Sequence, residues 1–159
     1  MITNTGNVDT FIRAGISANW FGTAGSEYGV AVGYDSSTSS NFIPAWKMSL
    51  SGSAFTDNYG GSFTGLPGTK WVYNPNDGFF YYTDPVPAGQ AVPNNLFTKY
   101  SLSGSNIPPA IYYLDQLNGK LPYSGVELVM DIPVQAIEAV QGKTYKQAWT
   151  AVGVSFNND

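Results

Sequence analysis

Residues 126–140, VELVMDIPVQAIEAV, constrain the fold more than any other stretch of this chain, because apolar and polar side chains alternate along them. Such a period of two is the signature of a half-buried β-strand. Pro133 cannot donate to a ladder, so it marks a sheet edge or a bulge, and Glu138 breaks the alternation, so the register is expected to shift near Ala136. One face collects Val126, Leu128, Met130, Ile132 and Val134, and the other collects Glu127, Asp131 and Gln135.

A second strand is expected over residues 8–16, where the alternation recurs. The residues before it, Asn4 to Asn7, are turn formers, and Gly6 is expected to take a positive φ there. The predicted faces are Val8, Thr10, Ile12, Ala14 and Ile16 against Asp9, Phe11, Arg13 and Gly15.

The stretch WVYNPNDGFFYYTDP predicts a β-hairpin. Aromatic strands at 71–73 and 79–82 flank the five residues Asn74 to Gly78, which include a proline and a glycine.

The remaining segments are less regular. EYGVAVGY, IPAWKMSLSG and LFTKYSLSG predict short strands, while DSSTSSN and the long SGSAFTDNYGGSFTGLPG predict loops. DPVPAGQAVPNN predicts an extended connector. PAIYYLDQLNGK fits a helix or a strand equally, as does YKQAW near the end.

Composition supports short strands and tight turns. The 159 residues are enough for one domain over 1–159, and they include 18 glycines and 10 prolines with only 11% charged side chains. Long helices need more Ala, Glu, Lys and Leu. The expected fold class is therefore all-β, a two-sheet antiparallel sandwich with long loops and at most short helices.

Several functions are excluded by what the sequence lacks. Without histidine or cysteine, the chain cannot build Ser-His-Asp or Cys-His triads, or zinc sites of those ligands. A net charge of −4 without a basic cluster argues against nucleic-acid binding, and no apolar run is long enough to span a membrane. We assign no catalytic, cofactor-binding or metal-binding residue. Low charge with abundant Ser, Thr, Asn, Gly and Tyr favours the cell exterior.

Four patterns are candidate sites. Glu27, Glu127 or Glu138 with an aspartate such as Asp131 could form a glycosidase pair, although a solvated strand face explains them more simply. NPNDG offers oxygens to calcium, but a hairpin loop uses the same residues. LPGT at 66–69 and LPYSG at 121–125 are interpreted as turns. The tryptophans and FFYY could stack on sugars, although such residues more often fill a core; the tryptophans are Trp20, Trp46, Trp71 and Trp149.

Three segments together resemble one family. NTGNVDTFIR is similar to the NTGN-x-D-ayvR segment of the TasA/camelysin-like exported proteins of Gram-positive bacteria, which a SipW-type signal peptidase processes. DGFFYYTDPVPAGQAVPNNLFTKYSLSG resembles the DGyyYY and LF segment of that group, and VELVMDIPVQAIEAVQG with its following AW resembles the closing segment. The chain departs from the group at Ala88, Val134 and Gln135, and residues 21–68 have no counterpart.

The resemblance implies an exported, non-enzymatic jelly-roll sandwich whose relatives build matrix fibres, with an N-terminal segment of one subunit completing the sheet of the next. It also implies a signal peptide and one further strand upstream. Because the chain starts abruptly at Ile2, an open groove is expected beside the strand of residues 8–16. The expected function is a surface or extracellular-matrix structural protein, with self-assembly or other surface proteins as partners. The alternatives are a glycan- or host-protein-binding module and, third, a carboxylate-dependent hydrolase.

Overall fold

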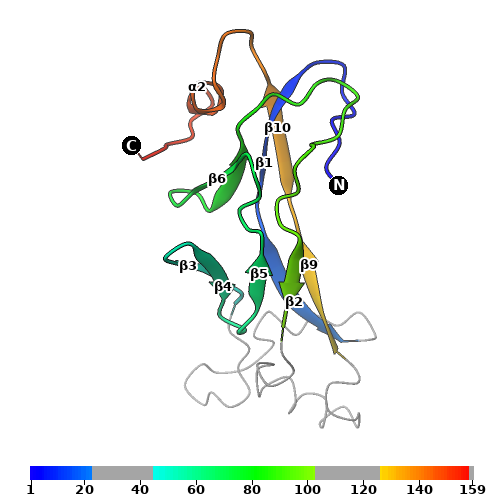
Figure 1. Ribbon diagram of the computed structural model, residues 1–159, viewed down its shortest axis with the longest axis vertical. Coiled ribbons are helices and arrows are strands. Elements are labelled where there is room, and N and C mark those ends of the chain that lie inside the picture. Colours follow the sequence, from blue (N-terminus) through cyan, green and yellow to red (C-terminus); the bar gives the residue numbers. More distant parts are fainter. Residues whose placement is uncertain (23–44, 103–125, 158–159) are drawn as a thin grey trace. The chain divides into compact units, whose positions relative to one another are not determined.

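The computed structural model describes residues 1–22, 45–102 and 126–157. These residues form ten strands and one short helix, and every strand pairing whose register is defined is antiparallel, which confirms the all-β prediction (Figure 1). The jelly-roll sandwich stays a prediction. The elements are β1 (Thr10–Ala14), β2 (Ser17–Gly22), β3 (Met48–Ser51), β4 (Ala54–Asp57), β5 (Ser62–Thr64), β6 (Trp71–Asn74), β7 (Phe79–Tyr82), β8 (Lys99–Ser101), β9 (Val126–Asp131), β10 (Val134–Glu138) and α2 (Tyr145–Thr150).

The chain divides into two compact units. The first unit comprises Met1–Ile16, Thr64–Lys99 and Ile132–Asp159, and the second comprises Ser17–Phe63 and Tyr100–Asp131. Each unit is built from segments that are far apart in the sequence. A single domain over 1–159 stays a prediction.

The first unit contains a four-stranded sheet in the order β10-β1-β7-β6. Its strand β1 is buried on both faces, since Phe11 and Ile12 are each only 2% exposed, whereas the sequence predicted a polar face for Phe11. The face of Phe11 is covered because Trp149 and Ala148 of α2 pack against Phe11 and Tyr81. A short helix therefore makes both faces of this strand part of the core.

The predicted aromatic hairpin is confirmed as β6 and β7. Trp71 pairs with Tyr82 and Tyr73 with Phe80, and the two pairs of rings lie 5.2 and 4.9 Å apart. Asn74 also belongs to the ladder, opposite Phe79, so the loop is one residue shorter than predicted. Aromatic cross-strand pairs of this kind stabilise a hairpin beyond their buried area.

The two long predicted strands are shorter than expected, and the second is interrupted at Pro133, where the sequence predicted an edge or a bulge. Residues 8–16 give only β1 before β2 begins at Ser17, and residues 126–140 give β9 and β10 on either side of Ile132 and Pro133. Gly15 donates its N–H to the Pro133 carbonyl at 2.9 Å, but proline has no N–H to return. The break thus lies where the ladder loses a donor.

The second unit corrects the predicted loop at 51–68. Residues in this stretch form β4 and β5, which belong to a sheet in the order β3-β4-β5-β8. Gly52 at φ +61 makes the turn between β3 and β4. The many Gly and Ser residues therefore form tight turns between short strands instead of a long excursion. The predicted strand EYGVAVGY and the ambiguous segment PAIYYLDQLNGK lie outside the described residues.

The turn at Asn4–Asn7 also differs from the prediction. Gly6 is not among the glycines with positive φ, and its N–H binds the Asn4 side-chain oxygen at 3.0 Å. The Asn4 amide in turn donates to the carbonyls of Val8 and Val86. The buried asparagine side chain, and not glycine's conformational freedom, organises this turn.

The segment YKQAW, for which the sequence left a helical turn or a strand open, lies in the helix α2. Thr144 caps it through a reciprocal bond with Gln147, a capping box. The connector at 84–95 contains no strand, as predicted, although Val86 bridges to Thr10 and Ala91 to Thr3. In the described part of the chain, no helix is long and apolar enough to cross a membrane.

A prediction follows for the LPGT turn. A Cβ on Gly68 would lie 1.8 Å from the backbone oxygen of Asn95, so Gly68→Ala is expected to cost about 2–3 kcal/mol of unfolding free energy, the usual cost of overpacking. Urea unfolding measures this loss. Gly78→Ala is the control, because a Cβ there meets nothing within 4 Å and its φ of +76 adds only backbone strain of about 1 kcal/mol. Equal losses in the two variants would contradict the predicted clash.

Candidate functional site

The outer edge of the sheet of the first unit, at β10, is exposed. Four of the five residues of this strand are exposed, including Val134 with 42% of its surface accessible. Strand β10 pairs with β1 on one side, and none of the described strands lies on its other side. Among the described strands, this five-residue strand is therefore paired on one of its two sides.

The register shows which backbone groups point outward. Gly15 bonds to Pro133, and Ala139 bonds to Asp9, so odd-numbered residues of β10 share hydrogen-bonded pairs with β1. In an antiparallel ladder the alternate residues direct their N–H and C=O groups the other way. The N–H and C=O groups of Val134, Ala136 and Glu138 therefore face the open edge.

Natural proteins protect such edges with lysines, prolines or bulges. Strand β10 contains no lysine and no proline, and Pro133 lies just before it. Pro133 accepts a bond from Gly15, so it ends the ladder without blocking the outer side of β10. Within residues 1–22, 45–102 and 126–157, no strand is paired with the outer side of β10.

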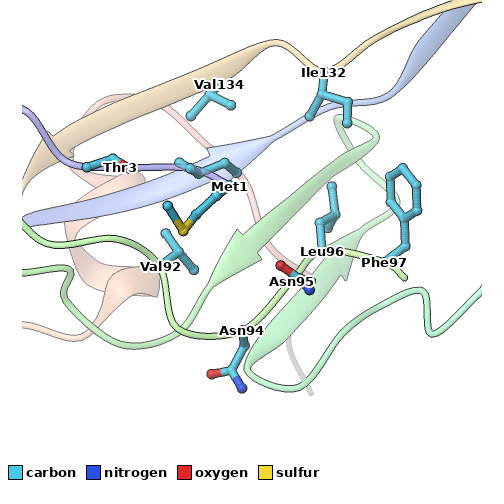
Figure 2. Close-up of a pocket in the computed structure, with 10 residues that line it drawn as sticks. Met1, Thr3, Val92, Asn94, Asn95, Leu96, Phe97, Ile132 and Val134 are labelled. Carbon is cyan, nitrogen blue, oxygen red and sulfur yellow. The ribbon is translucent and has the colours of Figure 1, made fainter. Parts of the chain in front are cut away.

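An apolar groove of about 470 Å³ lies beside this edge. Figure 2 shows Ile132 and Val134 on one side of it and Val92, Leu96 and Phe97 on the other, with Met1 between them. Ile132 is 40% exposed although the sequence placed it on a buried face. The groove is also lined by Ile2, Thr3, Asn94 and Asn95.

The N-terminal residues reach the groove because they pair with the connector. Asn4 donates to Gln90, and Val92 donates to Ile2, which aligns residues 2–4 against 89–92. The sequence predicted an open groove beside residues 8–16 instead. That prediction is wrong, because β1 has β10 on one side and β7 on the other.

A second cluster surrounds Arg13, which the sequence placed on a polar face. Its guanidinium lies 4.4 Å from the Phe79 ring and 4.6 Å from the Trp149 ring, and it pairs with Asp77 at 3.1 Å. The Tyr81 hydroxyl accepts from Arg13 at 2.8 Å and donates to Asp77. These groups satisfy one another, so the cluster holds α2 to the sheet and offers no vacant charge.

A third cluster, in the second unit, surrounds the buried Asp57. Its carboxylate accepts bonds from the backbone N–H groups of Tyr59 and Gly61, from Trp46 and from the Tyr100 hydroxyl. Burial and the nearby carboxylate raise the pKa of Tyr100. The carboxylate already accepts four bonds from protein donors, so the cluster stabilises the β4–β5 turn.

The buried tyrosines predict a loss of stability at high pH. Burial is the main cause that raises the pKa of Tyr59 and of Tyr81 from 10.0 to about 12. The protonated phenols stabilise the fold fully below pH 10, and this contribution falls as the pH rises toward 12. Each tyrosine is expected to remove up to about 1.4 kcal/mol per pH unit in that window.

Urea unfolding at several pH values, together with phenolate absorbance, measures this loss. In Tyr59→Phe the slope of stability against pH should decrease between pH 10 and 12. An unchanged slope in that variant would show that Tyr59 ionises without unfolding the chain.

The sequence candidates for a glycan platform are mostly in the core. Trp20, Trp71 and Trp149 are 2–4% exposed, and half-buried Trp46 donates to Asp57. Of the FFYY residues, Phe80, Tyr81 and Tyr82 are buried and Phe79 lies against Arg13. The alternative that these residues fill a core is confirmed.

The structure also shows where the candidate residues for a glycosidase pair and for a calcium site lie. Glu138 and Asp131 are exposed strand residues, while the side chains of Glu27 and Glu127 lie outside the described residues. In the NPNDG loop, the two asparagine amides donate to Ser155, and Asp77 binds Arg13 and the Phe79 N–H. The structure shows that side-chain oxygens of Asn74 and Asp77 accept bonds within the protein, as expected of a hairpin turn.

The sequence signal for a sheet edge near β10 was Pro133, which lies just before the strand. It did not show which neighbour β10 would have, because strand order depends on the whole fold. Comparison with protein-family models, with curated proteins and with solved structures finds no match to this chain.

Proposed function

We propose that this protein is a non-enzymatic structural protein of the cell surface or extracellular matrix, which assembles by adding a strand to the edge of β10. The observation that carries this proposal is the row of outward-facing groups of Val134, Ala136 and Glu138. An incoming strand gains affinity from main-chain hydrogen bonds, and pockets for alternate side chains give it specificity.

The groove beside β10 supplies such a pocket. Ile132 and Val134 expose apolar surface into it next to Leu96 and Phe97. A side chain of an added strand would cover these residues, and each 100 Å² of apolar surface removed from water contributes about 2.5 kcal/mol. Assembly at this edge would therefore be favoured by both hydrogen bonds and burial.

Export and fibre formation are proposed from the sequence. The resemblance of NTGNVDTFIR and VELVMDIPVQAIEAVQG to the TasA/camelysin-like proteins supports both, as does the low content of charged residues. The burial of three tryptophans gives no support to a glycan-binding platform, and the exposed Asp131 and Glu138 give none to a hydrolase.

The proposal predicts that charge at the edge prevents assembly. Ala136→Lys places a lysine among the outward-facing groups, and it should abolish the oligomers or filaments that the unmodified chain forms. Light scattering and negative-stain microscopy across pH and salt measure this. Leu50→Lys is the control, because Leu50 is 50% exposed on β3, which belongs to a different sheet.

Two results would count against the proposal. An unmodified chain that remains monomeric under every condition would remove the assembly role. Hydrolysis of peptide, ester or glycoside substrates that survives purification and disappears in Glu127→Gln would overturn the non-enzymatic role.

A further inference from the structure

We propose that the strand received by β10 comes from a second copy of this chain, so that two β10 strands pair antiparallel about a two-fold axis at Ala136. This inference rests on the proposed use of β10 as an assembly edge and names its partner. It gives a closed pair with one continuous sheet, because such an interface uses the same patch on both copies.

The outward-facing groups are complementary to themselves in this register. Ala136 lies opposite Ala136 of the second copy, and Val134 lies opposite Glu138 on each side. All three outward residues then form hydrogen-bonded pairs, and each such pair exchanges two bonds. Any other antiparallel register pairs only one or two of these residues, so the centred register leaves the fewest groups without partners.

The same register matches exposed apolar residues that lie beyond the ends of β10. Ile132 is 40% exposed and Val140 is 48% exposed. With Ala136 at the centre, Ile132 of one copy takes the position opposite Val140 of the other, and the match occurs twice. Two partly exposed apolar side chains thus meet beyond each end of the paired strands.

Charge also favours this register. Glu138 lies opposite Val134, and the two copies of Glu138 are four positions apart, or about 13 Å along the strands. A register centred on Glu138 would instead place two carboxylates directly opposite each other, which is destabilising. Lysine, which commonly blunts sheet edges, is absent from the strand.

The lack of cysteine makes the register directly measurable, because one introduced thiol is unique in the chain. Residues of a hydrogen-bonded antiparallel pair have Cα atoms about 5.5 Å apart, within the range of about 4.4–6.8 Å that a disulfide spans. Ala136→Cys should therefore form a covalent dimer under mild oxidation. Val134→Cys alone and Glu138→Cys alone should not, whereas a mixture of these two variants should.

The matched control is Val72→Cys, since Val72 is 40% exposed on β6 at the other edge of the same sheet. Ala136→Cys is expected to cross-link on the order of a hundredfold faster than Val72→Cys, because pairing raises the effective thiol concentration to the millimolar range. Equal rates for the two variants would overturn the proposal, as would efficient cross-linking of Val134→Cys with itself.

Failure here is distinguishable from failure of the proposed function. If Ala136→Lys dissolves assemblies of the chain but Ala136→Cys does not cross-link with itself, another segment fills the edge; the two-fold pairing is then wrong and strand addition stands. If Ala136→Cys gives a covalent dimer but the chain forms nothing larger, the pairing is supported and the fibre role fails.

Discussion

Replacing Asp57 with asparagine is expected to destabilise the second unit by about 3 kcal/mol, because the carboxylate accepts four hydrogen bonds at a buried position. Asp57 is 7% exposed. An asparagine keeps one acceptor oxygen but turns an amide N–H₂ group toward donors. At least one buried donor would then lose its partner, and each loss costs about 1–3 kcal/mol.

The positions of the four donors leave little room for the turn to rearrange around an asparagine. Oδ1 of Asp57 binds the N–H groups of Tyr59 and Gly61 at 2.9 and 2.8 Å, while Oδ2 binds Trp46 at 3.0 Å and Tyr100 at 2.5 Å. The turn is also tightly packed, because a Cβ added to Gly61 would lie 2.1 Å from the Tyr100 hydroxyl. The turn is therefore built around a carboxylate of fixed position.

Urea unfolding followed by far-UV circular dichroism measures the loss. The control is Asp84→Asn, because Asp84 forms an exposed ion pair with Lys70, with side chains 48% and 51% exposed, and such pairs contribute about 0–1 kcal/mol. If Asp57→Asn were as stable as Asp84→Asn, the carboxylate would not hold this turn.

The role of Asp57 could not be predicted from the sequence. Its segment, SGSAFTDNYGGSFTGLPG, has the composition of a loop, and the short strands β4 and β5 are too brief for a periodic pattern to reveal them. The turn that joins them is held by the Asp57 carboxylate, which accepts hydrogen bonds from Trp46 and Tyr100, 11 and 43 residues away in the sequence. Contacts of that separation leave no local signal.

The hairpin of β6 and β7 could be predicted because its determinants are local: two aromatic runs and a turn between them. The long strands were harder. Alternation identified residues 10–14 and 134–137 as strands, but it continues through Gly15 and Pro133, where pairing between distant segments ends the ladder. The register shift predicted near Ala136 is wrong, because β10 pairs with β1 in one register from Val134 to Glu138. The position of β10 at an edge followed from its neighbours, which alternation does not specify.

Arg13 shows the same limit, and its replacement is the second large effect that we expect. Alternation placed Arg13 on a solvated face. In the structure its side chain is 17% exposed, and its guanidinium lies 4.4 Å from the Phe79 ring and 4.6 Å from the Trp149 ring. The guanidinium also donates to Gln135 at 2.7 Å, to Tyr81 at 2.8 Å and to Asp77 at 3.1 Å.

Arg13→Met is expected to destabilise the first unit by about 2–3 kcal/mol, because it removes a half-buried guanidinium that donates to Gln135, Tyr81 and Asp77, and a hydrogen bond to a charged group contributes about 1.5–3 kcal/mol. Methionine keeps much of the apolar contact with Phe79 and Trp149, so the loss reports on charge and hydrogen bonds. Arg13→Lys should recover only part of it, since a compact ammonium cannot reach all three acceptors that the planar guanidinium contacts from Nε and Nη1. Urea unfolding followed by tryptophan fluorescence measures both variants.

A double-mutant cycle with Asp77→Asn separates the ion pair from the rest of the cluster. We expect a coupling energy of about 1–3 kcal/mol between Arg13 and Asp77, because the two contact each other and share the Tyr81 hydroxyl. Lys70→Met with Asp84→Asn is the matched exposed pair, and its coupling should stay below about 0.5 kcal/mol. Equal coupling in the two cycles would mean that Arg13 acts through its stacking on Phe79 and Trp149 alone, and that the bonds to Asp77 do not hold α2 against the sheet.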